Sequence, residues 1–470
     1  MPIVFSGKNS NKMVKVQAPR KITDLYHARI FHKNYPILPP IYRNGKFFFV
    51  YKRKVSIFVT EKDCHTMIVK FCITNYGPIR ETQTLSFEAE KSEHLEEYYV
   101  VNVAGHRILK AAILFGPNAS GKTYILNALN FLRNLATVPT SSKTALLPYE
   151  PFLMDEESRS KPTEFEIDFI QNDDLYRYNI KLNRQCVLYE RLRSQSRRRI
   201  VYTRTTDVES QLSKIVFGDD YPVKNDVEAA TLSSNTLWNE TVLAGFTKTN
   251  MAHKALQAVH VWFQSYLAPM VNPRADLTRF TLDLIDMGYV DKDKIIPILK
   301  KADFNIGGVT IRKAEESDEP LRLVHIGPDG TLTDDIPYAS ESLGTQRYFG
   351  LSGILYMLIA RASAFPIDEI ESSIHPELVK HFLLSFCTNS KHSQLLVTTH
   401  NRELLNDKDI FRSDIIQFTE KDENYATRLY RLSDFGTDVV RNTSNVLNAY
   451  NAGKLGAFPR LSDYYIDLSE

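Results

Sequence analysis

Short apolar segments separated by turns follow one another from residue 67 onward, and their periodicity predicts strands and helices. Segments rich in Val, Ile, Tyr and Phe predict strands at 67–71, 84–87, 98–103 and 108–115. The last of these is apolar apart from Lys110, as expected for a strand buried in a mixed α/β sheet. Residues 123–135 then carry apolar side chains at helical spacing, which predicts an amphipathic helix directly after that strand.

The middle of the chain changes character twice. Residues 165–169 alternate with a period of two, and residues 176–182 follow after an Asn-Asp-Asp turn, which predicts a β-rich stretch. Residues 227–301 carry apolar positions at helical spacing but no sustained heptads, so we expect a helical segment that is not a long coiled coil. Farther along, an apolar helix is expected up to Ala360 and an apolar strand at 394–399.

Composition places the chain among soluble globular proteins, because 43% of its residues are hydrophobic and 24% are charged. Its 470 residues predict two or three lobes. No apolar run approaches the roughly 20 residues of a membrane span, so no membrane association is expected. The cysteines lie far apart without a CxxC pair, which argues against a zinc ribbon or a disulfide framework and predicts a reducing, cytoplasmic location. They are Cys64, Cys72, Cys186 and Cys387.

The charge is distributed unevenly. Residues 1–66 hold 13 Lys and Arg against 3 Asp and Glu, whereas the whole chain has a net charge of only +2. A basic arm of this kind could contact nucleic acid or an anionic surface, or it could be an appendage of no set function. A third interpretation is a mis-called start, because Met67 stands directly before the first predicted core strand.

The segment between the strand at 108–115 and the helix at 123–135 has the pattern GxxxxGK[ST] of a phosphate-binding loop. Its residues are Gly116, Pro117, Asn118, Ala119, Ser120, Gly121, Lys122 and Thr123. The glycines let the backbone wrap phosphates, so that N–H groups and the helix N-terminus point at negative charge. Lys122 is expected to bridge the β- and γ-phosphates of ATP, and Thr123 to ligate Mg²⁺. The flanking strand and helix favour this interpretation over a chance Gly-rich turn.

A second group of candidate residues follows about 240 positions later, where residues 365–369 resemble a Walker B strand end. There Asp368 would hold a water ligand of the Mg²⁺ ion, and Glu369 would polarise the attacking water as the catalytic base. His400 ends the strand at 394–399 and is expected to sense the γ-phosphate. Asp-Glu pairs are common on surfaces and a lone His is often a polar cap, but the order of these features favours a site.

A third candidate lies between the loop and the Asp-Glu pair, at residues 341–347. Ser342 and Gly344 stand at the start of the helix that runs to Ala360, in the place of an ABC signature. A helix start of this kind binds anions, here the γ-phosphate held by a second subunit. The alternative is an ordinary helix start with Ser342 as its capping residue.

From Met67 to about Leu461 the sequence resembles the ABC-class AAA family ATPases of bacterial abortive-infection and restriction-linked loci. These RloA/AbiL-type ATP-binding proteins are distant relatives of the RecF, SMC and OLD ATPases. The resemblance rests on a joint set of motifs that together cover most of the chain. They lie at residues 73–79, 116–123, 162–167, 341–345, 367–371, 375–376, 398–401 and 450–459.

The resemblance implies an α/β fold, a P-loop ABC-type ATPase head with a mixed sheet and a helical insert or lid. Residues 67–135 and 336–470 would form the two halves of the head, and residues 136–335 the insert that carries specificity. It also implies a homodimer with ATP sandwiched between the loop of one protomer and Ser342 of the other. Growth into a higher oligomer stays open.

Two residues depart from the family pattern. Leu343 stands where the signature-like segment usually has Asp or Phe, although Ser342 and Gly344 are kept. Pro366 lies inside the Walker B strand, where a proline removes a donor from the sheet ladder. A local distortion of that strand and a change in the rate of ATP hydrolysis are therefore expected.

The function that the resemblance implies is the sensor or regulator of an anti-phage system that acts with a separate effector protein encoded nearby. The alternative is a nucleic-acid-binding or DNA-repair ATPase of the RecF type without a toxic partner. A nuclease of the OLD branch is less well supported, because only 70 residues follow His400. A basic cluster could contact nucleic acid or the effector, or could be a solvated hairpin. It consists of Arg191, Arg193, Arg197, Arg198 and Arg199.

Overall fold

The computed structural model describes residues 41–43, 46–48, 66–312, 321–407, 409–435 and 446–459. The chain divides into two compact units, Met1–Val55 and Ser56–Glu470. In the first unit, β1 (Ile41–Arg43) and β2 (Lys46–Phe48) form an antiparallel pair. Most of the predicted basic arm lies outside the described residues.

The second unit contains two large sheets. One is antiparallel throughout, with the strand order β12-β11-β10-β9-β8-β3-β4. Its strands are β3 (Thr66–Thr74), β4 (Gln83–Ser86), β8 (Thr163–Gln171), β9 (Asp174–Leu182), β10 (Val187–Ser194), β11 (Arg199–Asp207) and β12 (Leu212–Phe217). The other sheet is mixed and has the order β16-β17-β7-β18-β19. Its strands are β7 (Ala111–Phe115), β16 (Ala364–Ile367), β17 (Gln394–Thr398), β18 (Ile416–Lys421) and β19 (Thr427–Arg431).

Smaller sheets and helices complete this unit. β5 (Val100–Val103) pairs with β6 (His106–Leu109), and β13 (Ile306–Ile311), β14 (Leu321–Ile326) and β15 (Leu332–Pro337) form a three-stranded sheet. The longer helices are α2 (Lys122–Thr137), α4 (Asp226–Asn235), α6 (Lys254–Val261), α7 (Leu277–Asp286), α8 (Lys292–Lys301), α9 (Leu343–Ala360) and α10 (Pro376–Asn389). Short ones are α1 (Glu96–Tyr99), α3 (Glu156–Ser160), α5 (Val242–Thr247), α12 (Val446–Asn451) and the π-helical turn η2 (Trp262–Tyr266). Single 3₁₀ turns are η3 (Tyr338–Ser340), η4 (Arg402–Asn406), η5 (Ser413–Ile415) and η6 (Leu432–Asp434).

The antiparallel sheet has one buried and one solvated face, as the period-two pattern predicts. On β8, Phe165 and Ile167 are fully buried. Glu164, which precedes Phe165, points the other way and forms an ion pair with Lys181 of β9, with 2.5 Å between the Oε1 and Nζ atoms. The sequence patterns therefore predict both strands correctly.

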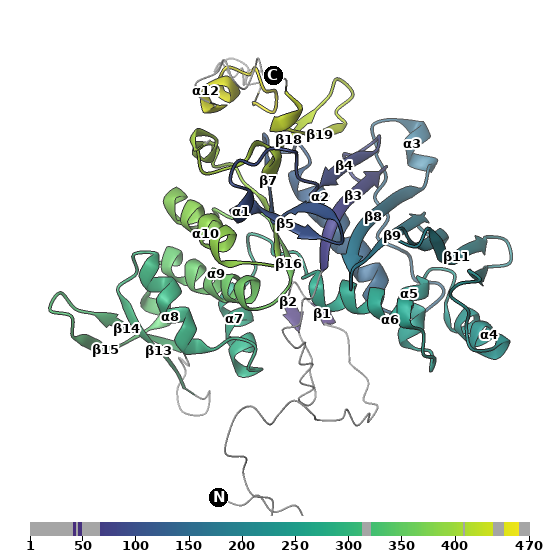
Figure 1. The fold of residues 1–470 in the computed structure, drawn as a ribbon, viewed down its shortest axis with the longest axis horizontal. Helices are drawn as coiled ribbons and strands as arrows, with labels where there is room; N and C mark the ends of the chain where they lie inside the picture. Colours follow the sequence, from purple (N-terminus) through teal and green to yellow (C-terminus); the bar gives the residue numbers. More distant parts are fainter. Residues whose placement is uncertain are drawn as a thin grey trace, which may run out of the picture. The chain divides into compact units, whose positions relative to one another are not determined.

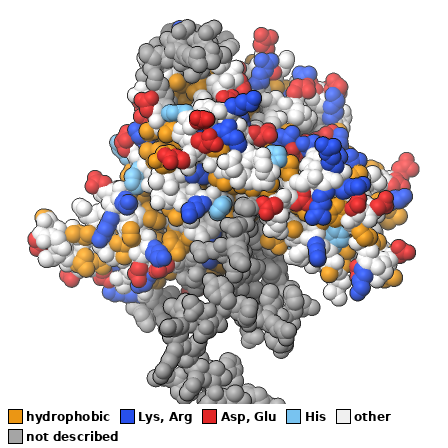
Figure 2. Space-filling model, in the orientation of Figure 1, with side chains coloured by type: hydrophobic (Ala, Val, Ile, Leu, Met, Phe, Trp, Pro, Cys, Tyr) orange, Lys and Arg blue, Asp and Glu red, His pale blue; other side chains and the backbone are white. Residues whose placement is uncertain are grey.

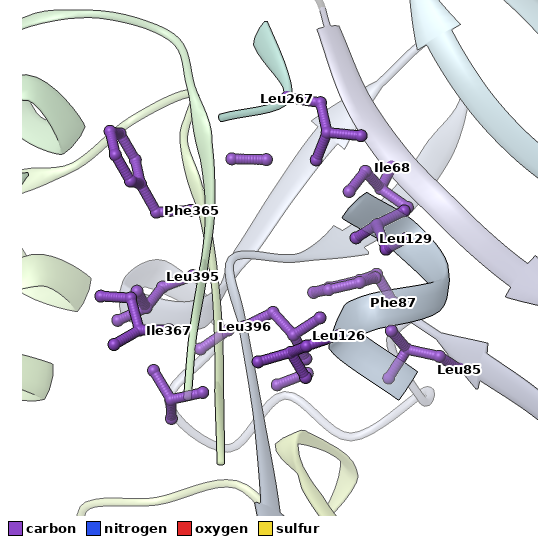
Figure 3. Packing of buried hydrophobic residues seen from close by; sticks show 14 of the residues in the cluster. Ile68, Leu85, Phe87, Leu126, Leu129, Leu267, Phe365, Ile367, Leu395 and Leu396 are labelled. Carbon is purple, nitrogen blue, oxygen red and sulfur yellow. The ribbon is translucent and has the colours of Figure 1, made fainter. Parts of the chain in front are cut away.

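The core lies between the two large sheets and is filled by α2. Leu126 and Leu129 are fully buried and point toward Phe87 and Leu396, as Figure 3 shows. The helices α9 and α10 lie on the opposite side of the mixed sheet from α2 (Figure 1). Every residue of β7 is buried because the strand is central in a sheet that helices cover on both faces.

The predicted strand at 108–115 is wrong in one respect, because it is broken at Lys110. Its first half, β6, pairs with β5, and its second half, β7, pairs with β17 and β18. The Lys110 side chain is buried and donates to the carbonyls of Cys387 and Ser390 at the end of α10, at 2.5 and 3.0 Å. The predicted strand at 98–103 likewise begins only at Val100, since the residues before it form α1.

The distortion expected from Pro366 is also wrong. Residues of β16 pair with those of β17 in one continuous register. The Pro366 carbonyl accepts a hydrogen bond from the Val271 N–H at 2.8 Å, so this residue directs its backbone groups away from β17. A proline is tolerated where its missing N–H faces the edge of a sheet.

The predicted α/β class with a mixed sheet is confirmed, and the helices α4 to α8 lie between β7 and β16 in the chain. The predicted domain boundary at residue 136 stays a prediction, and β8–β12 continue the sheet begun by β3 and β4. Within the described residues, the helices are too short or too polar to cross a membrane.

Candidate functional site

The loop from Gly116 to Thr123 connects the buried end of β7 to the start of α2. Gly116 and Gly121 adopt φ angles of 154° and 106°, which side chains rarely allow. A Cβ atom at Gly116 would collide with Thr419, and one at Gly121 with Thr427. Both glycines are therefore needed for backbone conformation and for the close approach of β18 and β19.

Lys122 lies inside this loop and is largely buried. Its ammonium group donates to the carbonyls of Gly116 and Pro117, at 2.7 and 3.0 Å. Burial lowers the pKa of Lys122 to about 8, and the nearby carboxylates of Asp368, Glu371 and Glu369 oppose that shift. The lysine is thus held against the loop backbone with three carboxylates nearby. A bound phosphate group would add further negative charge next to it.

A hydroxyl–carboxylate cluster joins the loop to the neighbouring strands. The Thr123 hydroxyl donates to the Asp368 carboxylate at 3.0 and 3.1 Å, and the Thr398 hydroxyl donates to its Oδ1 at 2.6 Å. The same Thr398 oxygen accepts from the Glu369 N–H at 2.8 Å. Because β7, β17 and β16 are parallel neighbours, their carboxyl ends meet at one edge, where open α/β sheets bind ligands.

This cluster fits a magnesium ion bound together with phosphates. Thr123 and Asp368 offer a hydroxyl and carboxylate oxygens, which Mg²⁺ prefers, and Mg²⁺ in such sites takes its other ligands from phosphate and water. Among the described residues, no group of three or more His, Cys, Asp and Glu side chains could hold a metal.

Glu369 directly follows Asp368 in the chain, and His400 lies two residues after Thr398, so both come to the same edge. Glu369 adopts a left-handed φ of 46°, a costly conformation for a residue with a side chain. Burial lowers the pKa of His400, and the positive charge of Lys122 lowers it further, so its imidazole is neutral at pH 7. All the residues predicted for phosphate binding, metal binding and catalysis on this edge are thus brought together.

Three further residues of the site were not predicted from the sequence. Glu371 accepts the His400 N–H at 2.6 Å through Oε1, while its buried Oε2 has no hydrogen-bond partner among the described residues. Thr419 forms a 2.6 Å hydroxyl contact with Ser120, and the Thr427 hydroxyl donates to the Ser120 carbonyl at 2.8 Å. Glu371 carried a signal, since it is the third acidic residue after β16, whereas the threonines follow no motif.

Ser342 and Gly344 lie at the start of α9. The Ser342 hydroxyl accepts a hydrogen bond from the Thr345 N–H at 3.1 Å. Ser342 therefore caps the helix, as the alternative interpretation of this segment predicts. Leu343 is 72% exposed between them. The hydrogen bonds of Ser342 stay within this first turn, and none joins it to the loop at 116–123 in the part of the chain that the structure describes.

A family model described as "AAA domain, putative AbiEii toxin, Type IV TA system" matches residues 111–406, from β7 to the segment after His400. No curated protein matches the chain.

Solved structures similar to this chain include three SMC head domains. The "SMC head domain from Thermotoga maritima" is 13% identical, with 77% of this chain and 98% of that chain covered and a TM-score of 0.37. An Smc head bound to the C-winged helix domain of ScpA is 14% identical, with 77% and 97% covered and a TM-score of 0.41. An Smc head with an extended coiled coil, bound to the C-terminal domain of ScpA derived from Pyrococcus furiosus, is 10% identical, with 80% and 98% covered and a TM-score of 0.36.

Proposed function

The chain belongs to this AAA-domain family, and from that premise we propose that it is an ABC-class ATPase that binds and hydrolyses ATP and dimerises on it. The observation that carries the proposal is the convergence of Lys122, the Thr123–Asp368 pair, Glu369 and His400 on one sheet edge. These groups supply charge neutralisation, metal ligation and water activation for phosphoryl transfer.

Each residue has a distinct task in this proposal. The N–H groups of the loop and the start of α2 bind the phosphates, and Lys122 neutralises their charge. Thr123 and Asp368 would hold Mg²⁺, which supplies charge stabilisation to the phosphates. Glu369 orients and deprotonates the attacking water. The neutral His400 donates a hydrogen bond to the γ-phosphate.

The start of α9 supports the dimer. It is a capped helix N-terminus with an exposed Leu343, and among the described residues no hydrogen bond joins Ser342 to the phosphate-binding loop. In the dimer that we propose, Ser342 and Gly344 of one protomer close over the nucleotide held by the other, and the N–H groups of α9 contact its γ-phosphate. ATP then joins two half-sites.

In the cell, we propose a role as sensor or regulator of an anti-phage abortive-infection system with a separate effector protein. The family description, which refers to a toxin of a toxin–antitoxin system, supports a defence context. Copurification of the chain with the product of an adjacent gene tests this role. Recovery of the ATPase alone, with neighbouring genes unrelated to toxins or nucleases, would argue against it.

The dimer is tested most simply with Ser342→Arg in a Glu369→Gln background, which retains ATP. The arginine fills the helix N-terminus, so nucleotide affinity should stay within about twofold while ATP-driven dimerisation, measured by light scattering, is lost. Ser342→Ala is the matched control, because it removes the cap without blocking the site. Dimerisation of the arginine variant at the normal ATP concentration would overturn the proposal.

A second candidate function, nucleic-acid binding, is favoured by one surface. Arg191 and Arg193 of β10 and Lys214 of β12 have no ion-pair partner among the described side chains, and Arg191 lies 5.2 Å from the centre of the Tyr189 ring. Figure 2 shows Lys and Arg side chains gathered over the right-hand part of the visible face. Binding of DNA or RNA that weakens steeply with salt and with Arg191→Glu would support this function, and salt-independent or absent binding would exclude it.

A further inference from the structure

Glu341 immediately precedes the cap of α9, and its carboxylate is held by another element. The His325 Nε2–H of β14 donates to Glu341 Oε1 at 2.7 Å. The Glu341 side chain is only 9% exposed, and His325 is its one hydrogen-bonding partner in the described part of the chain. A carboxylate next to a helix start is thus directed away from solvent and toward the three-stranded sheet.

The backbone around this pair is fixed, so the carboxylate is the group whose position is adjustable. The Glu341 N–H donates to the Tyr338 carbonyl at 3.1 Å, and the Gln346 amide donates to the Glu341 carbonyl at 3.0 Å. The Tyr338 hydroxyl donates in turn to the Gln346 carbonyl at 2.8 Å. Release of the side chain would leave these bonds in place and free only the carboxylate.

The remainder of α9 is anchored and cannot move away from a nearby charge. Gly350 and Gly353 face Leu277 and Thr281 of α7 so closely that a Cβ atom at either glycine would collide with them. The Thr281 hydroxyl also donates to the Gly350 carbonyl at 2.9 Å. The N-terminus of α9 therefore stays where it is while its anionic neighbour is held or released.

A free carboxylate and a phosphate compete for the same place. The first N–H groups of an 18-residue helix form an anion site, and Asp and Glu side chains near it are favourable ligands. A released Glu341 would bind these N–H groups itself or repel the incoming phosphate. Both effects weaken the affinity of the helix start for an anion from another molecule.

We infer that His325 is a positioning residue that sequesters Glu341 and so keeps the N-terminus of α9 open to the γ-phosphate of ATP bound by a second copy of this chain. This inference rests on the proposed dimer, whose two half-sites it connects to β14. It assigns to the three-stranded sheet a role in the composite site, because the sheet carries the donor that controls the charge beside Ser342.

The test uses the full chain in the Glu369→Gln background, with ATP-driven dimerisation followed by light scattering. His325→Ala should weaken dimerisation on the order of tenfold, which is the size expected of a carboxylate at a helix terminus. Glu341→Gln should dimerise within about twofold of the parent. The double variant His325→Ala/Glu341→Gln should return to that level, because the competing charge is gone. No effect of His325→Ala, or no rescue in the double variant, would overturn the inference.

A second pair of variants leaves His325 in place, in case its removal prevents folding. Glu341→Asp keeps the charge but is too short to hold the 2.7 Å contact, so it should weaken dimerisation whereas Glu341→Gln does not. Equal behaviour of these two variants would contradict the inference. Ser342→Arg separates the two proposals. If it blocks dimerisation and the Glu341 and His325 variants behave otherwise than stated, only this inference fails, whereas normal dimerisation of Ser342→Arg removes the dimer itself.

Discussion

Two regions of the molecule take part in the ATPase function that we propose, and they are built in opposite ways. At the loop of residues 116–123, side chains from four strands and α2 brace one another through buried hydroxyls and a carboxylate. At the start of α9, the capping serine bonds only within its own turn, and Leu343 beside it is 72% exposed. The first region is complete within one chain, and the second is open.

This difference indicates what each region needs in order to work. A braced loop is preorganised, so the ligand meets donors that are already in position and little ordering remains to be done on binding. An exposed helix N-terminus presents N–H donors, and in the dimer that we propose it gains its anionic ligand when a second molecule approaches. The loop should therefore determine affinity for ATP, and α9 should determine what ATP binding causes.

The largest effect should follow from Lys122→Ala. Its ammonium group is held against the loop backbone by the Gly116 and Pro117 carbonyls. Its removal should lower affinity for ATP by more than about 100-fold, because the phosphate charge is then not neutralised. Isothermal titration measures this, with the unfolding temperature as a control for folding. An unchanged affinity would mean that the braced region is not the nucleotide site.

Glu369→Gln should separate chemistry from binding at the same edge. The amide cannot take a proton from water, whereas Asp368 and Thr123 keep their contact. Turnover should fall by about 10² to 10⁴, with ATP affinity unchanged and a longer-lived dimer. Steady-state ATPase assays and light scattering on one preparation check both parts. Hydrolysis at the parent rate would show that Glu369 is not the base.

A smaller effect should appear in the pH dependence of ATP binding. Burial lowers the pKa of Lys122 to about 8, so the lysine is charged below pH 7 and loses its proton as the pH rises through 8. Affinity for ATP should be level below pH 7 and fall by roughly tenfold between pH 7 and 9, with proton uptake on binding. His400 is already neutral across this range, since its pKa is lowered. A flat profile up to pH 9 would contradict the assignment.

The smallest effect should come from the removal of one hydroxyl group that braces the loop. Thr419→Val removes the 2.6 Å hydroxyl contact with Ser120 but keeps the shape of the side chain. The loss of one buried hydrogen bond predicts a free-energy cost of about 1 kcal/mol, and thus a fivefold to tenfold loss of ATP affinity. Thr203→Val, on the outward face of the antiparallel sheet, is a matched control and should change nothing. Equal affinities in both variants would show that the loop does not depend on β18.

Much of the first region could be predicted from the sequence, because its signals are local. A glycine-rich loop between a buried strand and a helix, and an Asp-Glu pair at a strand end, each specify their own backbone. The alternation at residues 165–169 and the segment at 176–182 also predict β8 and β9 correctly. The break at Lys110 could not be foreseen, since it depends on α10 lying within reach of a lysine 277 positions earlier in the chain.

The remaining parts of the site depend on contacts that are distant in sequence. Thr419 contacts Ser120 although 299 positions separate the two residues in the chain. The contact requires β18 to pair in parallel with β7 and in antiparallel with β19. The consequence of Pro366 also depended on a neighbour, because a proline is harmless only if its missing N–H faces the sheet edge. His325 and Glu341 lie 16 positions apart and carry no recognisable motif.

The measurement that tests the account most directly is the ATPase activity of a mixture of Ser342→Arg and Lys122→Ala subunits. Each variant alone should be inactive. In Ser342→Arg the start of α9 is blocked, and Lys122→Ala lacks the phosphate-binding lysine. In the mixed dimer, the intact loop of the first faces the intact Ser342 of the second, so activity should return above that of either variant alone. Activity that stays at zero, with mixed dimers shown to form, would contradict a site shared between two chains.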